Sequence, residues 1–323
     1  MIEAQPNRVM YGKTLVELGE RNPKLIVFEA DIAKSTNTFQ FAHRFPERFF
    51  QVGVAEQNMM GIAAGVATTG LLPFVSTFAM FAGLRACEQV RTSIAYPRLN
   101  VKIVATNGGV EIAGDGVTHQ ATEDLAVMRA IPNLMVVSPS DPVTTRKATW
   151  AVAEYEGPVY MRLGRQINTV LYDDDIEFKL GRMLRPREGS DITIIATGNI
   201  VEQALRAAEE LAKEGIEARV LDCHTIKPID RKEIVRAARE TAGIVTAEDH
   251  NIIGGLGGAV CEVLAEEHPT TVRRVGLQDI FASSGRDFRK LLAHYHIDCG
   301  AIIEKARSIV HAHTTSRTAV QRL

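Results

Sequence analysis

The sequence predicts an α/β protein of two domains, each built from a mainly parallel sheet flanked by helices. Short apolar runs alternate with helical patterns along the first half of the 323-residue chain and again along the second half. Such alternation is typical of βαβ units. A polar stretch that carries three consecutive aspartates, at 173–175, separates the two alternating sets. We therefore predict a first domain over residues 1–170, a linker over residues 171–190 and a second domain over residues 191–323.

The predicted elements of the first domain follow the chain in alternation. Its strands are the apolar runs at residues 25–28, 74–75, 101–106, 134–137 and 158–161. Its helices cover residues 56–69, 78–96, 123–130 and 142–155. In the second domain the strands are expected at residues 192–196, 218–221, 243–247 and 271–275, and the helices near 200–214, 230–240, 257–267 and 301–312. In open α/β sheets, ligands bind in the loops that leave the carboxyl ends of the strands.

Composition narrows the classes of function. Lys and Arg number 37 against 39 Asp and Glu, a net charge of -2, which gives no reason to expect nucleic acid as a partner. The four cysteines are far apart and form no CxxC pair, so we expect a reducing cytoplasm and neither a zinc site nor disulfides. The amino terminus carries no pattern of a signal peptide. Residues 57–84 are uncharged, but glycines and Pro73 interrupt them, so we expect buried elements of the domain and no membrane span.

The glycine loop, residues 109–120, is the segment most typical of an active site. It follows the predicted strand at 101–106 and combines glycines with Asp115 and His119. Glycine lets the backbone turn sharply and approach a ligand closely. Two plainer interpretations stay open at this point, because Gly-Asp-Gly also occurs in ordinary turns and an isolated histidine is often structural.

A second candidate group lies upstream. Glu56 is the only charged residue between Arg48 and Arg85. Burying a carboxylate in so apolar a segment is costly unless it is protonated or hydrogen-bonded, so this glutamate is suited to share a proton with a ligand. The alternative is that Glu56 only stabilises the amino terminus of the helix that follows it.

The glycine cluster at 254–258 invites a dinucleotide-binding interpretation. Its spacing does not match G-x-G-x-x-G, and no acidic partner follows at the expected place. We predict a tight strand-to-helix turn there.

Two motifs together carry a family resemblance. Gly53-Val54-Ala55-Glu56-Gln57 and the segment Gly114 to Gln120, in this order within one α/β domain, resemble the pyrimidine-binding domain of transketolase-like thiamine diphosphate enzymes. The second half of the chain, with residues 222–230 and the glycine cluster, is similar to the transketolase C-terminal domain. The family's diphosphate-binding domain is missing. The chain therefore resembles the second subunit of a split transketolase.

This resemblance implies a reaction, cofactors and a partner. The enzyme would transfer a two-carbon ketol unit from a ketose to an aldose with thiamine diphosphate, which carries the difficult chemistry. A separate N-terminal transketolase subunit would supply the diphosphate site and the ligands of Mg²⁺ or Ca²⁺, so we expect no metal ligands in this chain. The expected assembly is α2β2, and this chain alone should be inactive.

The resemblance also implies roles for individual residues. Glu56 matches the glutamate that hydrogen-bonds the aminopyrimidine ring, and Phe78 and Phe81 match aromatic residues that pack on this ring. His119 matches the histidine beside the reacting carbon, and Asp115 matches the aspartate that binds a substrate hydroxyl. The phenylalanines alone would also suit an ordinary core helix.

Three residues fall where the family binds the far, phosphorylated end of the sugar, namely Arg8, Ser35 and Arg165. Arginine suits this task because its planar fork meets an oxyanion in a bidentate manner. Asn107 stands where the family commonly has a histidine among these contacts. The remote group of the sugar therefore stays open between a phosphate and branched, deoxy or sulfonated alternatives.

Two other functions are compatible with parts of this pattern. The beta subunit of a 2-oxo acid dehydrogenase carries a similar glutamate element, but Asp-Gly-Val-Thr-His-Gln suits sugar recognition better. 1-Deoxyxylulose 5-phosphate synthase shares that last motif but is one long polypeptide. A non-catalytic α/β scaffold subunit would have no need of both Glu56 and His119.

Overall fold

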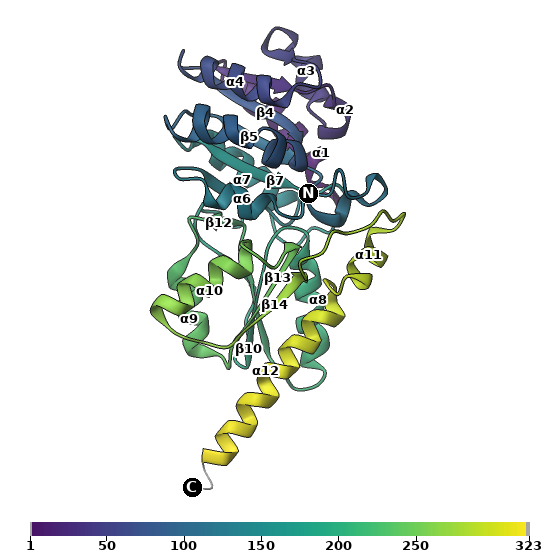
Figure 1. Ribbon diagram of the computed structural model, residues 1–323, viewed down its shortest axis with the longest axis vertical. Coiled ribbons are helices and arrows are strands. Elements are labelled where there is room, and N and C mark those ends of the chain that lie inside the picture. The colour runs from purple at the N-terminus through teal and green to yellow at the C-terminus, as the bar shows by residue number, and fades with distance from the viewer. Residues whose placement is uncertain (1, 321–323) are drawn as a thin grey trace.

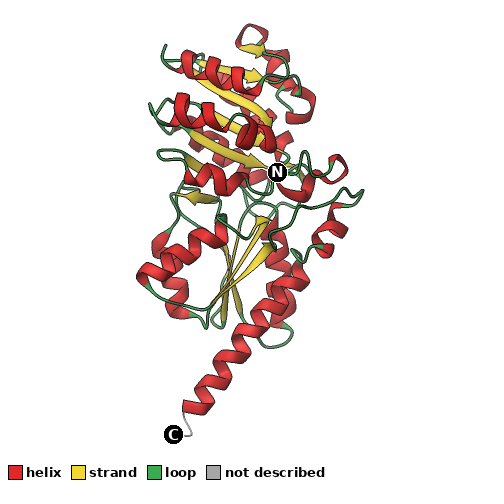
Figure 2. Cartoon of the chain, viewed as in Figure 1, coloured by secondary structure: helices red, strands yellow, loops and turns green. Residues whose placement is uncertain are grey.

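A computed structural model describes residues 2–320 and contains two stacked α/β units (Figure 1). The amino terminus lies near the middle of the molecule, and α12, Cys299–Val320, leads away from the second unit toward the carboxyl terminus (Figure 1). Helices flank the strands of both units (Figure 2). The predicted fold class is therefore confirmed.

The first sheet has seven strands in the order β12-β6-β7-β5-β4-β2-β3. All of its neighbouring strands run parallel except β12, which is antiparallel to β6. The strands are β2 Leu25–Glu29, β3 Phe49–Gln51, β4 Leu72–Phe78, β5 Lys102–Thr106, β6 Met135–Val137, β7 Val159–Leu163 and β12 Thr225–Lys227. Apolar runs suit the central strands because helices cover both faces of a parallel sheet.

Each face of this sheet has its own hydrophobic core. One core joins the sheet to α4, Glu56–Ala67, to residues 81–95 and to α6, Asp124–Ala130. The other joins it to α1, Asn7–Arg21, α3, Phe39–Arg44, and α7, Pro142–Glu154. The short helices α2, Ala33–Thr36, and η1, Pro46–Arg48, lie in the loops between these elements. A two-stranded pair, β1 Gln5–Pro6 and β8 Ile167–Asn168, joins the two ends of this region.

The second sheet has five strands in the order β14-β13-β10-β11-β9. They are β9 Leu184–Arg187, β10 Ile192–Ala196, β11 Ala218–Asp222, β13 Ile244–Asn251 and β14 Val272–Leu277. One core contains α8, Ile200–Ala212, α11, Phe288–His294, and α12, and the other contains α9, Arg231–Glu240, and α10, Leu256–Glu267.

The short strands β1, β3, β8, β9 and β12 and the helices α1, α2, α3 and α11 lie outside the elements expected from the sequence. β9 lies within the predicted linker and pairs antiparallel with β11, and β12 leaves the second half of the chain to pair with β6 of the first sheet. Both are edge strands of three or four residues. Such strands are set by tertiary pairing, because so few residues give no periodic signal.

Candidate active site

Glu56 is placed at the amino-terminal end of α4. Its side chain is nearly closed to solvent, with a residue exposure of 2%. The preceding loop turns at Gly53, which has a φ of 75°. The Arg85 guanidinium donates a hydrogen bond of 3.1 Å from Nη1 to Oε2 of Glu56. The carboxylate is therefore buried beside a cation that is itself half exposed.

An aromatic wall lies beside this carboxylate. Phe78 ends β4, and the rings of Phe78 and Phe81 stack with centroids 6.0 Å apart. The His119 ring meets both rings edge-on, at 5.2 Å from Phe81 and 6.1 Å from Phe78. Leu84, at the position where the family often has a third aromatic residue, is partly buried. The structure thus brings Phe78, Phe81 and His119 together from segments far apart in the sequence.

Arg85 is a site residue that the sequence analysis did not select. Its guanidinium carbon lies 4.3 Å from the centroid of the Phe81 ring, so the cation covers that ring while it also binds Glu56. Residues 81–85 form a π-helical turn, η2, where an α-helix was predicted. Such turns are frequent at functional sites. The available signal was the i, i+4 spacing from Phe81, which places both side chains on one face of a helical segment.

The glycine loop begins after β5 as a 3₁₀ segment, η4, Gly109–Asp115. Its backbone is bent at Ala113, which has a φ of 54°, and at Gly116, which has a φ of 74°. Asp115 is exposed, and His119 is partly buried with its Nδ1 2.9 Å from the Thr118 hydroxyl. Both predicted substrate-contacting side chains therefore project from the same irregular loop.

The residues predicted to bind the remote end of the sugar also lie together. Arg8 donates hydrogen bonds to the backbone carbonyls of Ser35 and Arg165. Arg165 donates a bond of 3.0 Å to Asp115, which joins this group to the glycine loop. Burial and the nearby charge of Arg165 lower the pKa of Arg8. Two guanidinium groups held close together are stabilised by an anion between them, so this group suits an anionic ligand.

Asn107 follows β5 in the left-handed backbone region, with a φ of 63°. The residue is 1% exposed, and its Oδ1 has no hydrogen-bond partner. An amide oxygen that is buried and unpaired is a free acceptor for a hydroxyl or N–H donor.

The glycine cluster at 254–258 forms the turn before α10, with Gly254 at a φ of 77°. The Glu248 carboxylate accepts hydrogen bonds from the backbone N–H groups of Leu256 and Gly257. A phosphate would need these same N–H groups. The turn is therefore closed by the protein's own carboxylate, in agreement with the structural interpretation of these glycines.

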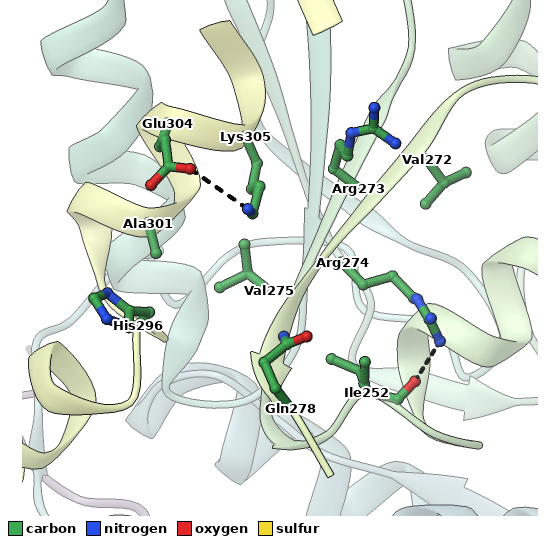
Figure 3. Close-up of a pocket in the computed structure, with 10 residues that line it drawn as sticks. All are labelled: Ile252, Val272, Arg273, Arg274, Val275, Gln278, His296, Ala301, Glu304 and Lys305. Atoms are coloured by element: carbon green, nitrogen blue, oxygen red, sulfur yellow. Dashed lines mark hydrogen bonds and ion pairs between the residues drawn. The ribbon is translucent and has the colours of Figure 1, made fainter. Parts of the chain in front are cut away.

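A cavity of about 530 Å³ lies away from these residues, between β14 and α12 (Figure 3). Its lining includes Arg273, Arg274 and Lys305, and the last of these pairs with the neighbouring Glu304. None of the predicted site residues lines it.

Within residues 2–320, no cluster of three His, Cys, Asp or Glu side chains is arranged to hold a metal ion. No helix in the same range has both the length and the apolar character needed to cross a membrane.

Arg85 shows that a planar group with N–H donors fits beside Glu56. Its guanidinium is planar, lies over Phe81 and donates to the buried carboxylate at the same time. An aminopyrimidine ring is likewise flat and would need an aromatic face and a carboxyl partner together. The residues present therefore fit the pyrimidine end of thiamine diphosphate.

Comparison with known proteins decides the family. The family model for the transketolase pyrimidine-binding domain matches residues 3–169, and that for the transketolase C-terminal domain matches residues 181–302. The chain belongs to the transketolase family. Its relatives include a 48% identical chain assigned as a transketolase C-terminal section from Methanocaldococcus jannaschii, with 91% of this chain and 93% of that one covered.

Two further matches concern transketolases made of separate subunits. A 6-deoxy-6-sulfo-D-fructose transketolase subunit from a Clostridium species is 42% identical, with 86% of each chain covered. A solved structure described as a split gene transketolase, inactive beta4 tetramer, is 49% identical at a TM-score of 0.89, with 95% of this chain and 99% of that chain covered. This chain is accordingly a subunit of a split transketolase, and the predicted family and function are confirmed. The family depends on thiamine diphosphate.

Proposed function

We propose that this subunit supplies the pyrimidine half of each transketolase active site. Glu56, Phe78 and Phe81 would hold the aminopyrimidine ring, and His119 and Asp115 would contact the sugar next to the bond that is cleaved. The proposal rests on one observation: Glu56 and the Phe81 ring both contact the Arg85 guanidinium, and His119 lies against the same Phe81 ring. The ranges of the two matched family models support the division into domains at 1–170 and 191–323, joined by residues 171–190.

The chemistry divides between cofactor and protein. When bound, thiamine diphosphate would supply the chemistry by which the bond to the two-carbon unit is cleaved and formed again. Glu56 holds a proton at the ring nitrogen from a buried position, where water does not compete for it. His119, fixed against the two phenylalanine rings, donates to the oxygen on which negative charge develops. Asp115 accepts from a substrate hydroxyl and is oriented by Arg165.

The substrate is proposed to be a ketose with an anionic remote group. Arg8 and Arg165 form the cationic end of the site, and the backbone near Ser35 completes it. A sulfonate presents three oxyanion atoms as a phosphate does but carries one negative charge. The relative that acts on 6-deoxy-6-sulfo-D-fructose shows that a transketolase subunit of this type works with such a sugar. Because Asn107 is neutral, it suits the single charge of a sulfonate better than a histidine would.

The partner is proposed to be an N-terminal transketolase subunit that carries the diphosphate site and the ligands of Mg²⁺ or Ca²⁺, in an α2β2 assembly in the cytoplasm. The related beta4 tetramer is described as inactive, which supports a requirement for the second subunit. The test is to co-purify the partner with this chain and measure ketol transfer with thiamine diphosphate and Mg²⁺. We expect activity from the mixture and none from either chain alone. Activity of this chain alone would contradict the proposal.

A further inference from the structure

The glycine loop is held at both of its ends by the second domain. Near its start, the backbone N–H of Val110 donates a buried hydrogen bond of 2.9 Å to Oδ1 of Asp249, at the end of β13. Just beyond its other end, the Thr122 carbonyl accepts a bond of 2.7 Å from the N–H of Asn251. Asp249 and Asn251 are two residues apart on β13, so one strand end of the second domain fixes both ends of the loop.

Two further residues of the loop, Ala113 and Gln120, contact the second domain as well. Nε2 of Gln120, the neighbour of His119, donates a bond of 3.1 Å to the carbonyl of Ser283. The carbonyl of Ala113, where the backbone is bent, accepts a bond of 3.3 Å from the N–H of Gly285. The loop therefore lies against two segments of the second domain, the end of β13 and the residues around 284.

Arg162, a residue of the first domain, also connects the glycine loop to β13. Its Nη2 donates to the carbonyl of Asp249 at 2.8 Å and to the carbonyl of Ala121 at 3.1 Å, and its Nε lies 3.3 Å from Oδ2 of Asp124. The same Ala121 carbonyl accepts a bond of 2.8 Å from the N–H of Gly109. One buried guanidinium thus joins the base of the loop to the strand that carries Asp249.

Asp249 has the most direct role of these groups. It is 1% exposed, and a Cβ at Gly109 would come within 2.2 Å of its carboxylate, so backbone and carboxylate are in close approach. Val110 is fully buried, so bulk solvent does not reach its N–H to replace a lost acceptor. Removing the carboxylate would leave a buried donor unsatisfied, which destabilises the local structure. The cost falls on the segment that leads to Asp115 and His119.

We propose that Asp249 is a positioning residue for the active site, and that through it the C-terminal domain holds the glycine loop in the geometry that aims His119 and Asp115 at the substrate. Asp249 is buried against the backbone of the loop, and its proposed role is exerted through the loop alone. The consequence for catalysis rests on the proposed function, whereas the effect on the loop does not. A displacement of about 1 Å in such groups lowers a rate by up to about 100-fold.

Hydrogen exchange of the full-length chain, without partner or cofactor, tests the structural step. In Asp249→Ala we expect the amides of residues 109–122 to exchange at least about tenfold faster than in the wild type. Glu248→Ala is the matched control, because Glu248 is also a buried carboxylate of β13 that accepts two backbone N–H bonds but binds only within its own domain. Glu248→Ala should speed amide exchange at the start of α10 and leave the exchange of residues 109–122 unchanged. Asp249→Asn keeps the Oδ1 acceptor and should restore most of the protection.

Activity of the reconstituted enzyme tests the second step. We expect Asp249→Ala to lower kcat by about 10- to 100-fold at saturating cofactor and sugar, while Glu248→Ala lowers it less than threefold. If Asp249→Ala does not fold, Gln120→Met, which removes only the bond to Ser283, should still speed exchange of residues 115–122. Unchanged exchange in these variants, or equal effects from Glu248→Ala, would overturn the proposal. If the wild-type complex shows no ketol transfer, the proposed function fails, while the exchange result still decides the role of Asp249.

Discussion

Arg85 and Glu56, 29 residues apart in the sequence, are joined by a hydrogen bond of 3.1 Å that connects a half-exposed cation to a buried carboxylate. The same guanidinium lies over the Phe81 ring. If the aminopyrimidine takes both of these contacts, as proposed, Arg85 and the cofactor would compete for one place.

The first prediction concerns Glu56 itself. Glu56→Gln keeps the shape of the side chain and an acceptor for Arg85 but cannot share a proton with the ring. We expect kcat of the reconstituted enzyme to fall by at least about 100-fold, the usual scale for loss of a proton-transferring group. Steady-state assays at saturating donor and acceptor sugars measure this. The melting temperature of the variant should stay within about 2 °C of the wild type. Near-normal activity would show that Glu56 is not the proton-sharing group.

The second prediction concerns the stability of the pair. Arg85→Ala leaves the buried Glu56 carboxylate without its cation, and we expect unfolding free energy to fall by about 1 kcal/mol, a low value because Arg85 is half exposed. Urea denaturation of the isolated chain measures it. Lys213→Ala is the control, since Lys213 pairs with Glu210 in an exposed position and its loss should leave the stability nearly unchanged. If Arg85→Ala is as stable as the wild type, the ion pair is not formed in solution.

Combining Arg85→Ala with Glu56→Gln separates the contribution of the ion pair to the unfolding free energy from that of packing. If the ion pair accounts for the loss, Arg85→Ala should cost clearly less in a Glu56→Gln background than in the wild type. Equal costs in both backgrounds would assign the loss to the contact between Arg85 and Phe81.

The third prediction concerns the choice of sugar. Asn107 is neutral and leaves its Oδ1 unpaired. Asn107→His would add a group that can become cationic at the position where the family commonly has a histidine, so we expect kcat/KM for a phosphorylated ketose to rise relative to the sulfonated analogue by about 5- to 10-fold. Parallel assays of the two donors with the same acceptor measure this ratio. An unchanged ratio would show that Asn107 does not determine which of the two sugars is preferred.

Much of the site could be predicted because its residues lie in short motifs with a strong local signature. Glu56 stands alone in an apolar segment, and Asp115 and His119 share one glycine loop. Their convergence with Phe78 and Phe81 follows from the parallel sheet, which brings loops at the carboxyl ends of neighbouring strands together.

The remaining features depend on contacts that no local pattern encodes. Asp249 binds Val110 across 139 residues, and nothing near either residue in the sequence points to the other. Arg85 stands out in the sequence only as the next charge after Glu56 and by its i, i+4 spacing from Phe81, and neither feature shows that it binds Glu56. The edge strands β9 and β12 are likewise set by their partners in the folded chain.

The fourth prediction concerns pH and the segment that carries Ser35. Glu29, at the end of β2, accepts hydrogen bonds from the hydroxyls of Thr36 and Thr38, at 2.7 and 2.6 Å. Burial raises the pKa of Glu29 from 4.5 to about 7, although these hydrogen bonds oppose the shift. The folded state therefore favours the protonated acid. Its contribution to stability is complete below pH 4.5 and is lost as the pH rises through about 7.

Glu29→Gln removes this titration and keeps the size of the side chain. Between pH 5 and pH 8 the wild type should lose about 2 kcal/mol of unfolding free energy relative to the variant, because charging a buried carboxyl is unfavourable. Urea denaturation at several pH values measures the difference between the two curves. Glu154→Gln, at the exposed end of α7, should give a curve parallel to that of the wild type. If the Glu29→Gln curve is parallel as well, Glu29 is ionised in the folded chain at pH 5, and the segment around Ser35 is held by a charged carboxylate.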